Sequence, residues 1–522
     1  MKTFKKTLPV ILLSVLLALS MLIAGCTKEP ETNANEEENQ TETVQKDDTA
    51  QAEEEEGLDH VKLTMITAGV PQSDHALVND AINKYIKEDL NVTLDFQQID
   101  FASWQDKSNL IIASGEECDI LFTGDWTQYP TDAAKGAFIA LDDLIPQYAP
   151  DIYAANYNWL LDAARINGNI YAVPTYQILA QSRGFILRKD LVDKYGPEVD
   201  FEVKDVNDPE DLEPLLNVIK ENEPDMTPLY QVPWKHLAFL GPYDRQGKEP
   251  TAINCYDDEP VYVNYYSTDY YIERAELARS WFEAGLTNAD IATSKEEVKT
   301  IYAAGNIFAV GFQTNPSEKS SIENMTGFEI VMYPTISPII STSLARGSMF
   351  AIPIQSENPE RALMFLNKLH TDKNLVNMFV YGIEGTHYVK REGEDNIIDP
   401  APGVDTTNTP YVNQIWMFGN QSLLYTYGDE DPDAPTVLKE FNDNAVRSPA
   451  LGFSYNPENM QNELAALANV VAEYDPVISS GAVDMYEDGL YDKFLEKLQA
   501  AGIEKLLEDQ NSQLQEWMDI NK

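Results

Sequence analysis

Residues 166–174 read Ile166-Asn167-Gly168-Asn169-Ile170-Tyr171-Ala172-Val173-Pro174. The Asn167-Gly168 pair predicts a turn, because asparagine and glycine both tolerate the positive φ values that tight turns require. An apolar run follows the turn and predicts a strand that ends at Pro174. The stretch therefore predicts a tight turn followed by a strand.

The part of the chain before this turn alternates between strand patterns and helix patterns. Strands are expected at 61–65, 91–99 and 119–123, and helices at 77–86 and 104–113. Such alternation predicts a parallel sheet that is covered by helices on both faces. Because ligands bind beyond the carboxyl ends of the strands in such sheets, the loops Thr67–Asp74 and Gly124–Trp126 are expected to contribute to a binding site.

Further motifs follow in order along the chain. They are Gly136–Leu141, Phe185–Leu191, the helical Tyr266–Gly285, the strand-like Ala304–Val310, and Ser356–Leu366 with Pro359 at a helix start. Together with residues 166–174, this series resembles the extracellular solute-binding lipoproteins of ABC transporters, in particular the carbohydrate-binding, family 1-like group. Tyr381–Tyr388 is similar to a stretch in a subgroup of large members, and the residues from Leu451 onward resemble the domain of unknown function in which that subgroup ends.

The resemblance implies an α/β, two-lobed periplasmic-binding-protein-like fold of type II with extra C-terminal helices. Residues 58–177 and 313–357 are expected in lobe 1, residues 178–312 and 358–440 in lobe 2, and residues 441–522 in a helical C-terminal domain packed on the lobes. The implied function is to capture a carbohydrate, in particular an oligosaccharide, between the lobes and to deliver it to the permease subunits of an ABC importer. A monomer is expected.

The first 25 residues have the features of a secretory signal peptide. Lysines precede an apolar run, Leu8–Ile23, that is too short to span a bilayer. Ile23-Ala24-Gly25-Cys26 resembles the lipobox of bacterial lipoproteins, whose cysteine is acylated and becomes the first mature residue. Residues 26–57 are acidic and nearly free of large apolar side chains, which predicts a disordered tether. We therefore expect a protein on the extracellular face of the cell membrane that is anchored by lipid on Cys26.

Composition excludes one class of partner and limits the role of disulfides. The chain of 522 residues has a formal net charge of −49, and such an acidic surface repels phosphate backbones, so nucleic acid is not expected as a partner. Apart from Cys26, the chain has only Cys118 and Cys255. We assign these two cysteines to different lobes and expect free thiols.

A sugar site needs aromatic planes for the C–H faces of the rings and polar side chains for the hydroxyls. Asp125 and Trp126 follow the third predicted strand, and Tyr176 and Gln177 follow Pro174, where the resemblance implies the first crossing between the lobes and a hinge. The other candidates are Trp234, His236, Gln313, Arg346 and Trp416. For Trp126 the alternative is a rim position packed on Tyr129, and for Arg346 it is a structural ion pair. The tryptophans at helical spacing among apolar residues are predicted to be core: Trp104, Trp281 and Trp517.

Two other groups of residues have some features of a catalytic or metal site, but a structural role explains them better. Glu384 and His387 could perform acid–base catalysis, but they lie in a glycine-rich turn after a helix, where a structural or ligand-proximal hydrogen bond explains them better. A set of carboxylates has the spacing of a calcium loop: Asp429, Asp431, Asp433 and Glu440. Because Pro432 interrupts that loop and Ala434 replaces its glycine, we interpret it as a solvated acidic loop.

We therefore predict a binding protein with no catalytic residue, no metal and no cofactor. Two functions remain as alternatives. An extracellular glycoside hydrolase would place two carboxylates across a cleft, and an acidic sequence always offers candidates for such a pair. A surface adaptor lipoprotein would bind no small molecule.

Overall fold

The fold is that of a computed structural model of the whole chain. The structure describes residues 58–521 except Pro71, 155–157, 233–240, 246–248, Glu297, 405–408 and Asp429. The described residues belong to one unit, which starts at Leu58. No helix within these ranges is long and apolar enough to cross a membrane. The predicted signal peptide, the tether and Cys26 lie outside the described residues.

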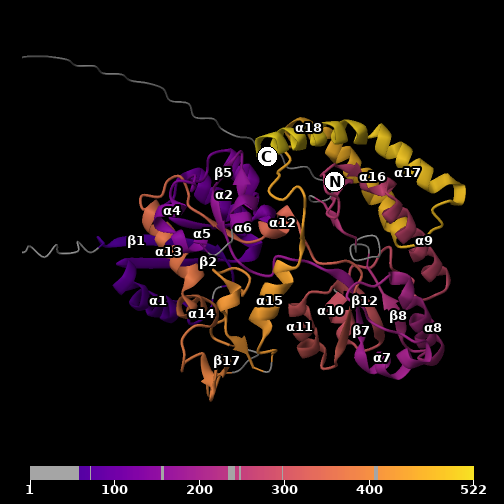
Figure 1. Cartoon of the computed structure of the whole chain (residues 1–522), viewed down its shortest axis with the longest axis horizontal. Coiled ribbons are helices and arrows are strands. Elements are labelled where there is room, and N and C mark those ends of the chain that lie inside the picture. Colours follow the sequence, from indigo (N-terminus) through magenta and orange to yellow (C-terminus); the bar gives the residue numbers. More distant parts are fainter. Residues whose placement is uncertain are drawn as a thin grey trace, which may run out of the picture. The chain divides into compact units, whose positions relative to one another are not determined.

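A five-stranded sheet forms the centre of the first lobe (Figure 1). The strands lie in the order β2-β1-β3-β15-β6, and they are β1 (Val61–Ala68), β2 (Val92–Ile99), β3 (Ile120–Thr123), β6 (Ala172–Pro174) and β15 (Met349–Ala351). β1 is parallel to β2 and β3, with Val61 opposite Val92 and Met65 opposite Ile120. β15 is antiparallel to β3 and to β6. The three expected strands and their parallel pairing are thus confirmed.

Amphipathic helices pack on this sheet. α1 (His75–Leu90) buries Val78, Ile82, Ile86 and Leu90, and α2 (Phe101–Ser114) buries Trp104, which confirms Trp104 as a core residue. The other helices of this lobe are α3 (Tyr129–Ala134), α4 (Ile145–Tyr148), α5 (Pro150–Ala154), α6 (Asn158–Ala163), α13 (Pro359–Thr371) and α14 (Lys373–Tyr381).

The Asn-Gly turn is present where the sequence predicts it. β4 (Arg165–Ile166) pairs antiparallel with β5 (Asn169–Ile170), and Asn167 and Gly168 have φ values of 51° and 86°. Both residues at the tip of this hairpin therefore take the left-handed conformation that two-residue hairpin turns favour. β6 follows directly and is the last strand of the first sheet before the chain enters the second lobe.

A four-stranded sheet forms the centre of the second lobe. Its order is β13-β7-β12-β8, and the strands are β7 (Arg183–Arg188), β8 (Thr227–Tyr230), β12 (Ile307–Gln313) and β13 (Ile330–Pro334). Its helices are α7 (Lys189–Tyr195), α8 (Glu213–Asn222), α9 (Asp269–Glu283), α10 (Val298–Ala303) and α11 (Pro316–Thr326). Trp281 of α9 is fully buried in this lobe and donates from Nε1 to Glu213 Oε2 at 3.0 Å, which confirms it as a core residue.

The lobe boundaries in the structure differ from those expected from the sequence. β13 pairs with β7, so the second lobe continues beyond residue 313, and the chain returns to the first sheet between Pro334 and Met349. α13 and α14 belong to the core of the first lobe, whereas the sequence resemblance implies lobe 2 for residues 358–440. The ring of Phe379 in α14 lies 5.2 Å from that of Phe96 in β2. An apolar helical stripe shows that a helix is buried but not which sheet covers it.

Besides several 3-10 turns, further short strands and helices occur in the described chain. They are β9 (Tyr243–Asp244), β10 (Thr251–Asn254), β11 (Val263–Asn264), β14 (Ile339–Ile340), α12 (Thr342–Ala345), β16 (Tyr388–Arg391), β17 (Glu394–Pro400), β18 (Thr426–Tyr427), α15 (Ala434–Asp443) and β19 (Val446–Arg447). β14 pairs in parallel with β19, so the chain before the C-terminal helices runs beside the segment that returns from the second lobe.

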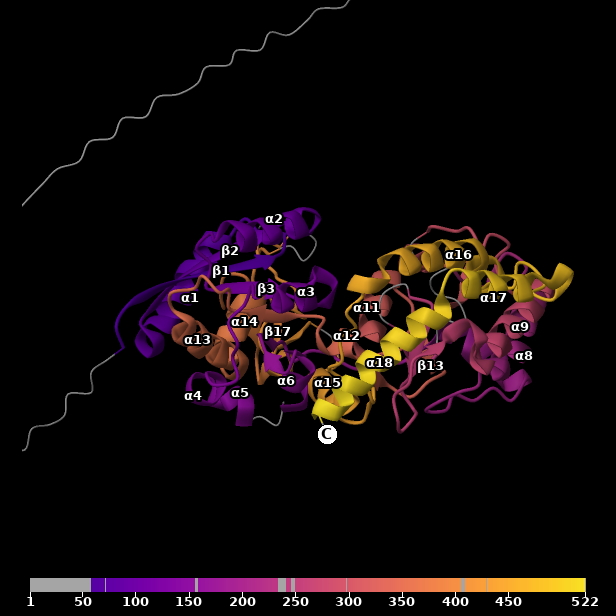
Figure 2. The same cartoon turned by 90° about the horizontal axis from the view of Figure 1, so that it is seen from above.

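Three helices end the chain and pack against α9 and its neighbours in the second lobe (Figures 1 and 2). They are α16 (Gln461–Ser479), α17 (Leu490–Ala500) and α18 (Ile503–Asn521). Their shared core joins aromatic residues of the second lobe to helix residues such as Phe494, whose ring lies 4.9 Å from that of Tyr266. Trp517 is partly buried against the same core.

Cys118 and Cys255 are both buried, free thiols in the structure. Cys118 belongs to the core around the first sheet, and Cys255 follows β10 near Ile336 and Ile339. Burial raises the pKa of each thiol to about 12, so neither side chain is a thiolate at neutral pH.

Candidate functional site

The loop after β3 presents an indole at the carboxyl edge of the first sheet. Asp125–Thr127 form a single 3-10 turn, and Trp126 remains 52 % exposed while its Nε1 donates to Gly347 O at 2.8 Å. Gly124 allows this contact, because a Cβ at that position would lie 2.9 Å from Gly347 O. The backbone therefore fixes the indole in place and leaves much of it accessible.

Trp126 is one end of a row of aromatic rings in the first lobe. Its ring centroid lies 5.8 Å from that of Phe122, which lies 6.1 Å from that of Trp416, and Trp416 lies 6.3 Å from Phe101. The sequence placed Trp416 in the second lobe, but its ring packs in the core of the first. The two predicted tryptophans therefore lie on one lobe and are linked by Phe122, while Phe101 forms the other end of the row. Sequence reasoning missed both phenylalanines.

Two loops extend this apolar surface. The backbone N–H groups of Asp74 and Val412 donate to Pro410 O (3.2 Å) and Gln72 Oε1 (3.3 Å), so the 410–415 segment lies on the loop after β1. Several apolar side chains are exposed here: Val70, Val412 and Ile415. An apolar residue just after a predicted strand, such as Val70 or Phe101, is the sequence signal that could have identified them.

Asp125 lies against a buried guanidinium. Arg346 is 1 % exposed, and its Nη1 lies 3.7 Å from Asp125 Oδ1, while the Asp125 side chain keeps 27 % of its surface exposed. Burial raises the pKa of Asp125, and the charge of Arg346 opposes this effect. Arg346 donates to the carbonyls of Ala163, Arg165 and Gly452 and to Ser454 Oγ. Its charge is therefore already occupied by protein acceptors.

Tyr176 and Gln177 lie at the junction between the lobes. The Tyr176 N–H donates to Gly419 O at 2.9 Å, and Tyr176 O accepts from the N–H of Gln421 at 2.7 Å. The Tyr176 ring is buried, and Gln177 is partly exposed with its carbonyl held by Asn442 Nδ2 at 2.7 Å. The structure thus places both residues just after β6, where the chain leaves the first sheet, as expected.

The second lobe contributes a polar strand end. Gln313 ends β12, is partly buried and lies opposite Arg183 in the register with β7. Arg183 donates to Gln181 Oε1 at 3.1 and 2.9 Å and to Gly241 O at 3.1 Å. Trp234 and His236 lie outside the described residues, so their predicted contact with a ligand stays a prediction.

The residues that suggested other chemistry have structural partners. His387 Nδ1 accepts from the Ile383 N–H at 2.9 Å, its Nε2 lies 3.3 Å from Asp74 Oδ2, and Glu384 pairs with Lys390 at 3.7 Å. This supports the hydrogen-bonding interpretation of the pair.

The described part of the acidic loop, like the rest of the described residues, assembles no metal site. In the acidic loop, Asp431 Oδ1 accepts from the Asp433 N–H at 2.9 Å, and Asp429 is outside the described residues. Among the described residues no group of three or more His, Cys, Asp and Glu side chains is arranged to hold a metal ion.

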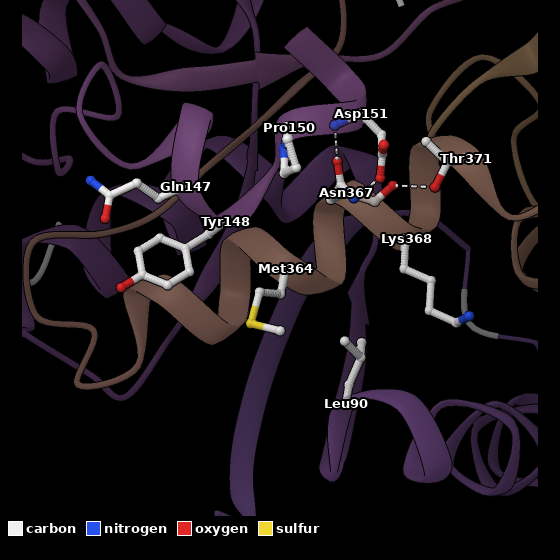
Figure 3. A pocket seen from close by; sticks show the side chains of 9 residues that line it. All are labelled: Leu90, Gln147, Tyr148, Pro150, Asp151, Met364, Asn367, Lys368 and Thr371. Atoms are coloured by element: carbon white, nitrogen blue, oxygen red, sulfur yellow. Dashed lines mark hydrogen bonds between the residues drawn. The ribbon is translucent and has the colours of Figure 1, made fainter. Parts of the chain in front are cut away.

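A separate groove of about 390 Å³ lies among the helices of the first lobe (Figure 3). α1, α4, α5 and α13 form it, and Tyr148, Met364 and Leu90 supply its apolar wall. Asn367 holds Asp151 through Nδ2–Oδ2 (2.8 Å), and Lys368 pairs with Asp89 and Asp372, so polar groups at its rim are engaged within the protein. Because Leu90 ends α1 just before β2 begins, this groove lies at the amino edge of the sheet, opposite the aromatic row.

Comparison with known proteins gives two family matches and several relatives. Residues 69–375, more than half of the chain, match the model of bacterial extracellular solute-binding proteins, and residues 449–519 match a domain of unknown function (DUF3502). The chain is 29 % identical over 470 residues to a carbohydrate ABC transporter substrate-binding protein of Streptococcus pneumoniae serotype 4, covering 88 % of this chain and 91 % of the relative.

Solved structures agree with this match. The N-glycan transport solute-binding protein NgtS of Streptococcus pneumoniae is 28 % identical with a TM-score of 0.77, covering 88 % of this chain and 100 % of NgtS. Against its complexes with Man1GlcNAc and Man5GlcNAc, covering 99 % of NgtS, the TM-scores are 0.65 and 0.62. The two-lobed, type II architecture and the extra C-terminal helices are thus those of this group. The chain belongs to the family of bacterial extracellular solute-binding proteins.

Proposed function

We propose that the protein captures an oligosaccharide between its two lobes and delivers it to the permease subunits of an ABC importer. The observation that carries the proposal is the aromatic row Phe101, Trp416, Phe122 and Trp126 at the carboxyl ends of the first sheet, with its terminal indole exposed. Flat aromatic faces pack well on the C–H faces of sugar rings, and neighbouring polar groups can bind the hydroxyls. The names of the relatives support the same ligand class.

The proposed contacts come from three regions. Asp125, Trp126 and Trp416 contribute from the first lobe, Tyr176 and Gln177 from the hinge, and Gln313, Trp234 and His236 from the second lobe. Arg346, which the sequence proposed as a contact, is buried beneath the first of these regions. We therefore assign it the role of holding Asp125 in place, because its donors already have protein acceptors.

The proposal includes closure of the two lobes about the chain segments that connect them. In support of it, this chain is less similar to the complexes of NgtS with Man1GlcNAc and Man5GlcNAc (TM-scores 0.65 and 0.62) than to the NgtS structure described without a glycan (0.77). The indole of Trp126 is 52 % exposed in the structure, and a ligand that enters between the lobes requires such access.

The alternatives are separated by a thermal-shift screen over mono- and oligosaccharides that includes Man1GlcNAc and Man5GlcNAc. A binding protein is stabilised by about 2.7 kcal/mol at a glycan concentration of 100 times Kd, and the glycan is recovered unchanged. A glycoside hydrolase would release new reducing ends. A surface adaptor would show neither effect with any sugar, and this outcome would contradict the proposed function.

The lipid anchor is proposed from the Ile23–Cys26 motif and the tether after it. Cys26→Ala is expected to remove the protein from the lipid-anchored membrane fraction and to give soluble or uncleaved protein. The variant has no thiol to acylate, and a polar tether alone does not hold a protein on a bilayer. Fractionation and mass spectrometry of the N-terminus measure both effects. An unmodified Cys26 inside a longer N-terminus of the parent protein would contradict the anchor.

Asp125→Asn is expected to weaken glycan binding about tenfold without lowering the melting temperature at pH 7, because it removes a charged acceptor. Burial raises the folded-state pKa of Asp125, so its charged form costs stability at neutral pH, and this cost falls as the pH decreases toward the folded pKa. A neutral amide therefore does not destabilise the fold. Asp132→Asn, whose carboxyl pKa is also raised by burial, is the control and should leave affinity unchanged. Full affinity of Asp125→Asn would exclude Asp125 from the site.

A further inference from the structure

The segment that leads into the C-terminal helices contacts the guanidinium beneath the candidate site. Arg346 Nη2 donates to Gly452 O at 2.7 Å, and Nη1 donates to Ser454 Oγ. On its other side the same guanidinium donates to Ala163 O at 2.5 Å and Arg165 O at 2.9 Å. One buried side chain thus joins the first lobe to residues 452–454.

Arg346 and Gly347 also hold the loop that carries Asp125 and Trp126. The Asp125 N–H donates to Arg346 O at 3.0 Å, the Trp126 indole donates to Gly347 O, and the Asp125 carboxylate faces Nη1. A displacement of Arg346 therefore moves the backbone, the indole support and the charge partner of this loop together. The first two contacts are made by the backbone carbonyls of Arg346 and Gly347, and the third by the Arg346 side chain, which residues 452–454 hold.

The segment itself has little freedom. Gly452 has a φ of +94°, and a Cβ there would lie 3.1 Å from Asp162 O. Thr342 Oγ1 donates to Ala450 O at 3.1 Å and accepts from the Gly452 N–H at 3.0 Å. Phe453 packs edge-on against Trp517 of α18, with ring centroids 5.9 Å apart. The helices that rest on the second lobe are thus connected through Phe453 to the support of Arg346.

We propose that residues 450–455, held by α18, position the loop Gly124–Thr127 through Arg346, so that the C-terminal domain is part of the ligand-binding apparatus. The effect on ligand binding rests on the proposed function, whereas the positioning of the loop by Arg346 does not depend on it. The C-terminal domain thereby acquires a role: it connects the ligand loop of one lobe to the body of the other.

Hydrogen–deuterium exchange of the ligand-free protein tests the positioning. Gly452→Ala and Ser454→Ala are expected to speed exchange of the amides of residues 124–129 about tenfold, since each change weakens bonds to a charged group. Gly403→Ala is the matched control, because Gly403 has a similar φ of +89° but no atom within 4 Å of a built Cβ. If the exchange rates of residues 124–129 are unchanged in both Gly452→Ala and Ser454→Ala, the proposal is overturned.

A double-mutant cycle with Man1GlcNAc tests the consequence for binding. Ser454→Ala is expected to weaken affinity about fivefold in the parent but less than about twofold in the Asp125→Asn background, since it acts through that carboxylate. Equal losses in both backgrounds would overturn this coupling and show a merely structural role. If the exchange result holds but the parent binds no glycan of the panel, the positioning stands and the proposed function fails.

Discussion

A chain that ends at Ala450 is expected not to form a soluble, cooperatively folding protein. The truncation exposes apolar and aromatic residues of the second lobe that the C-terminal helices cover: Ile253, Tyr262, Tyr265, Tyr266 and Tyr271. Each large side chain that loses its burial costs about 1.5–3 kcal/mol, so five of them approach the stability of about 5–15 kcal/mol typical of a folded domain. Arg346 also loses Gly452 O and Ser454 Oγ as acceptors, which leaves part of a buried charge unpaired.

If the truncated chain does not fold, point variants in the full chain can measure how much the C-terminal helices stabilise the protein. Phe494→Ala should lower the free energy of unfolding by about 3–5 kcal/mol in urea, because the ring is fully buried between Tyr266 and Tyr474. Leu110→Ala removes a largely exposed side chain and should change it by less than about 0.5 kcal/mol. A truncated protein with the melting temperature of the parent would refute the role of the helices in stability.

Trp126→Ala is expected to weaken oligosaccharide binding by at least about 2 kcal/mol, or roughly 30-fold, while the apo melting temperature stays nearly unchanged. The indole is 52 % exposed, so its removal costs the fold one hydrogen bond to Gly347 O and part of a contact with Phe122. In the closed complex the same indole would be covered by a sugar ring, which explains why affinity falls more than stability. Calorimetry and thermal unfolding measure the two quantities.

Tyr486→Ala is the matched control for this variant. Tyr486 is 58 % exposed and bonds through its hydroxyl to Glu276, so it resembles Trp126 in exposure and anchoring but lies before α17, among the C-terminal helices. Its removal should leave affinity unchanged. If Trp126→Ala binds as tightly as the parent, Trp126 is only a rim residue, and if it unfolds, the indole belongs to the core.

Local patterns predicted the elements of this fold well. The apolar spacing of α1 and α2, the turn at Asn167-Gly168 and the start of α13 at Pro359 depend on residues close in sequence, and each is confirmed. The lobe that α13 and α14 join was not predictable in this way. Their apolar faces suit either sheet, and the choice depends on the return of the chain between Pro334 and Met349.

In the candidate site, too, local features were predictable from the sequence and long-range contacts were not. The exposure of Trp126 follows from its place after a buried strand, and the structure agrees. The surroundings of Arg346 do not follow from local sequence, because the acceptors of its guanidinium lie 106 to 183 residues away along the chain. Local sequence therefore does not show whether an arginine in a loop next to a proposed site contacts a ligand or holds the protein's own backbone.

Carbohydrate capture without turnover is tested most directly by calorimetric titration of the parent protein with the oligosaccharide panel, followed by mass analysis of the recovered glycan. We expect saturable heat at one glycan per protein, and a glycan of unchanged mass after incubation. Shortened glycan, or the absence of saturable heat across the whole panel, would contradict capture between the lobes.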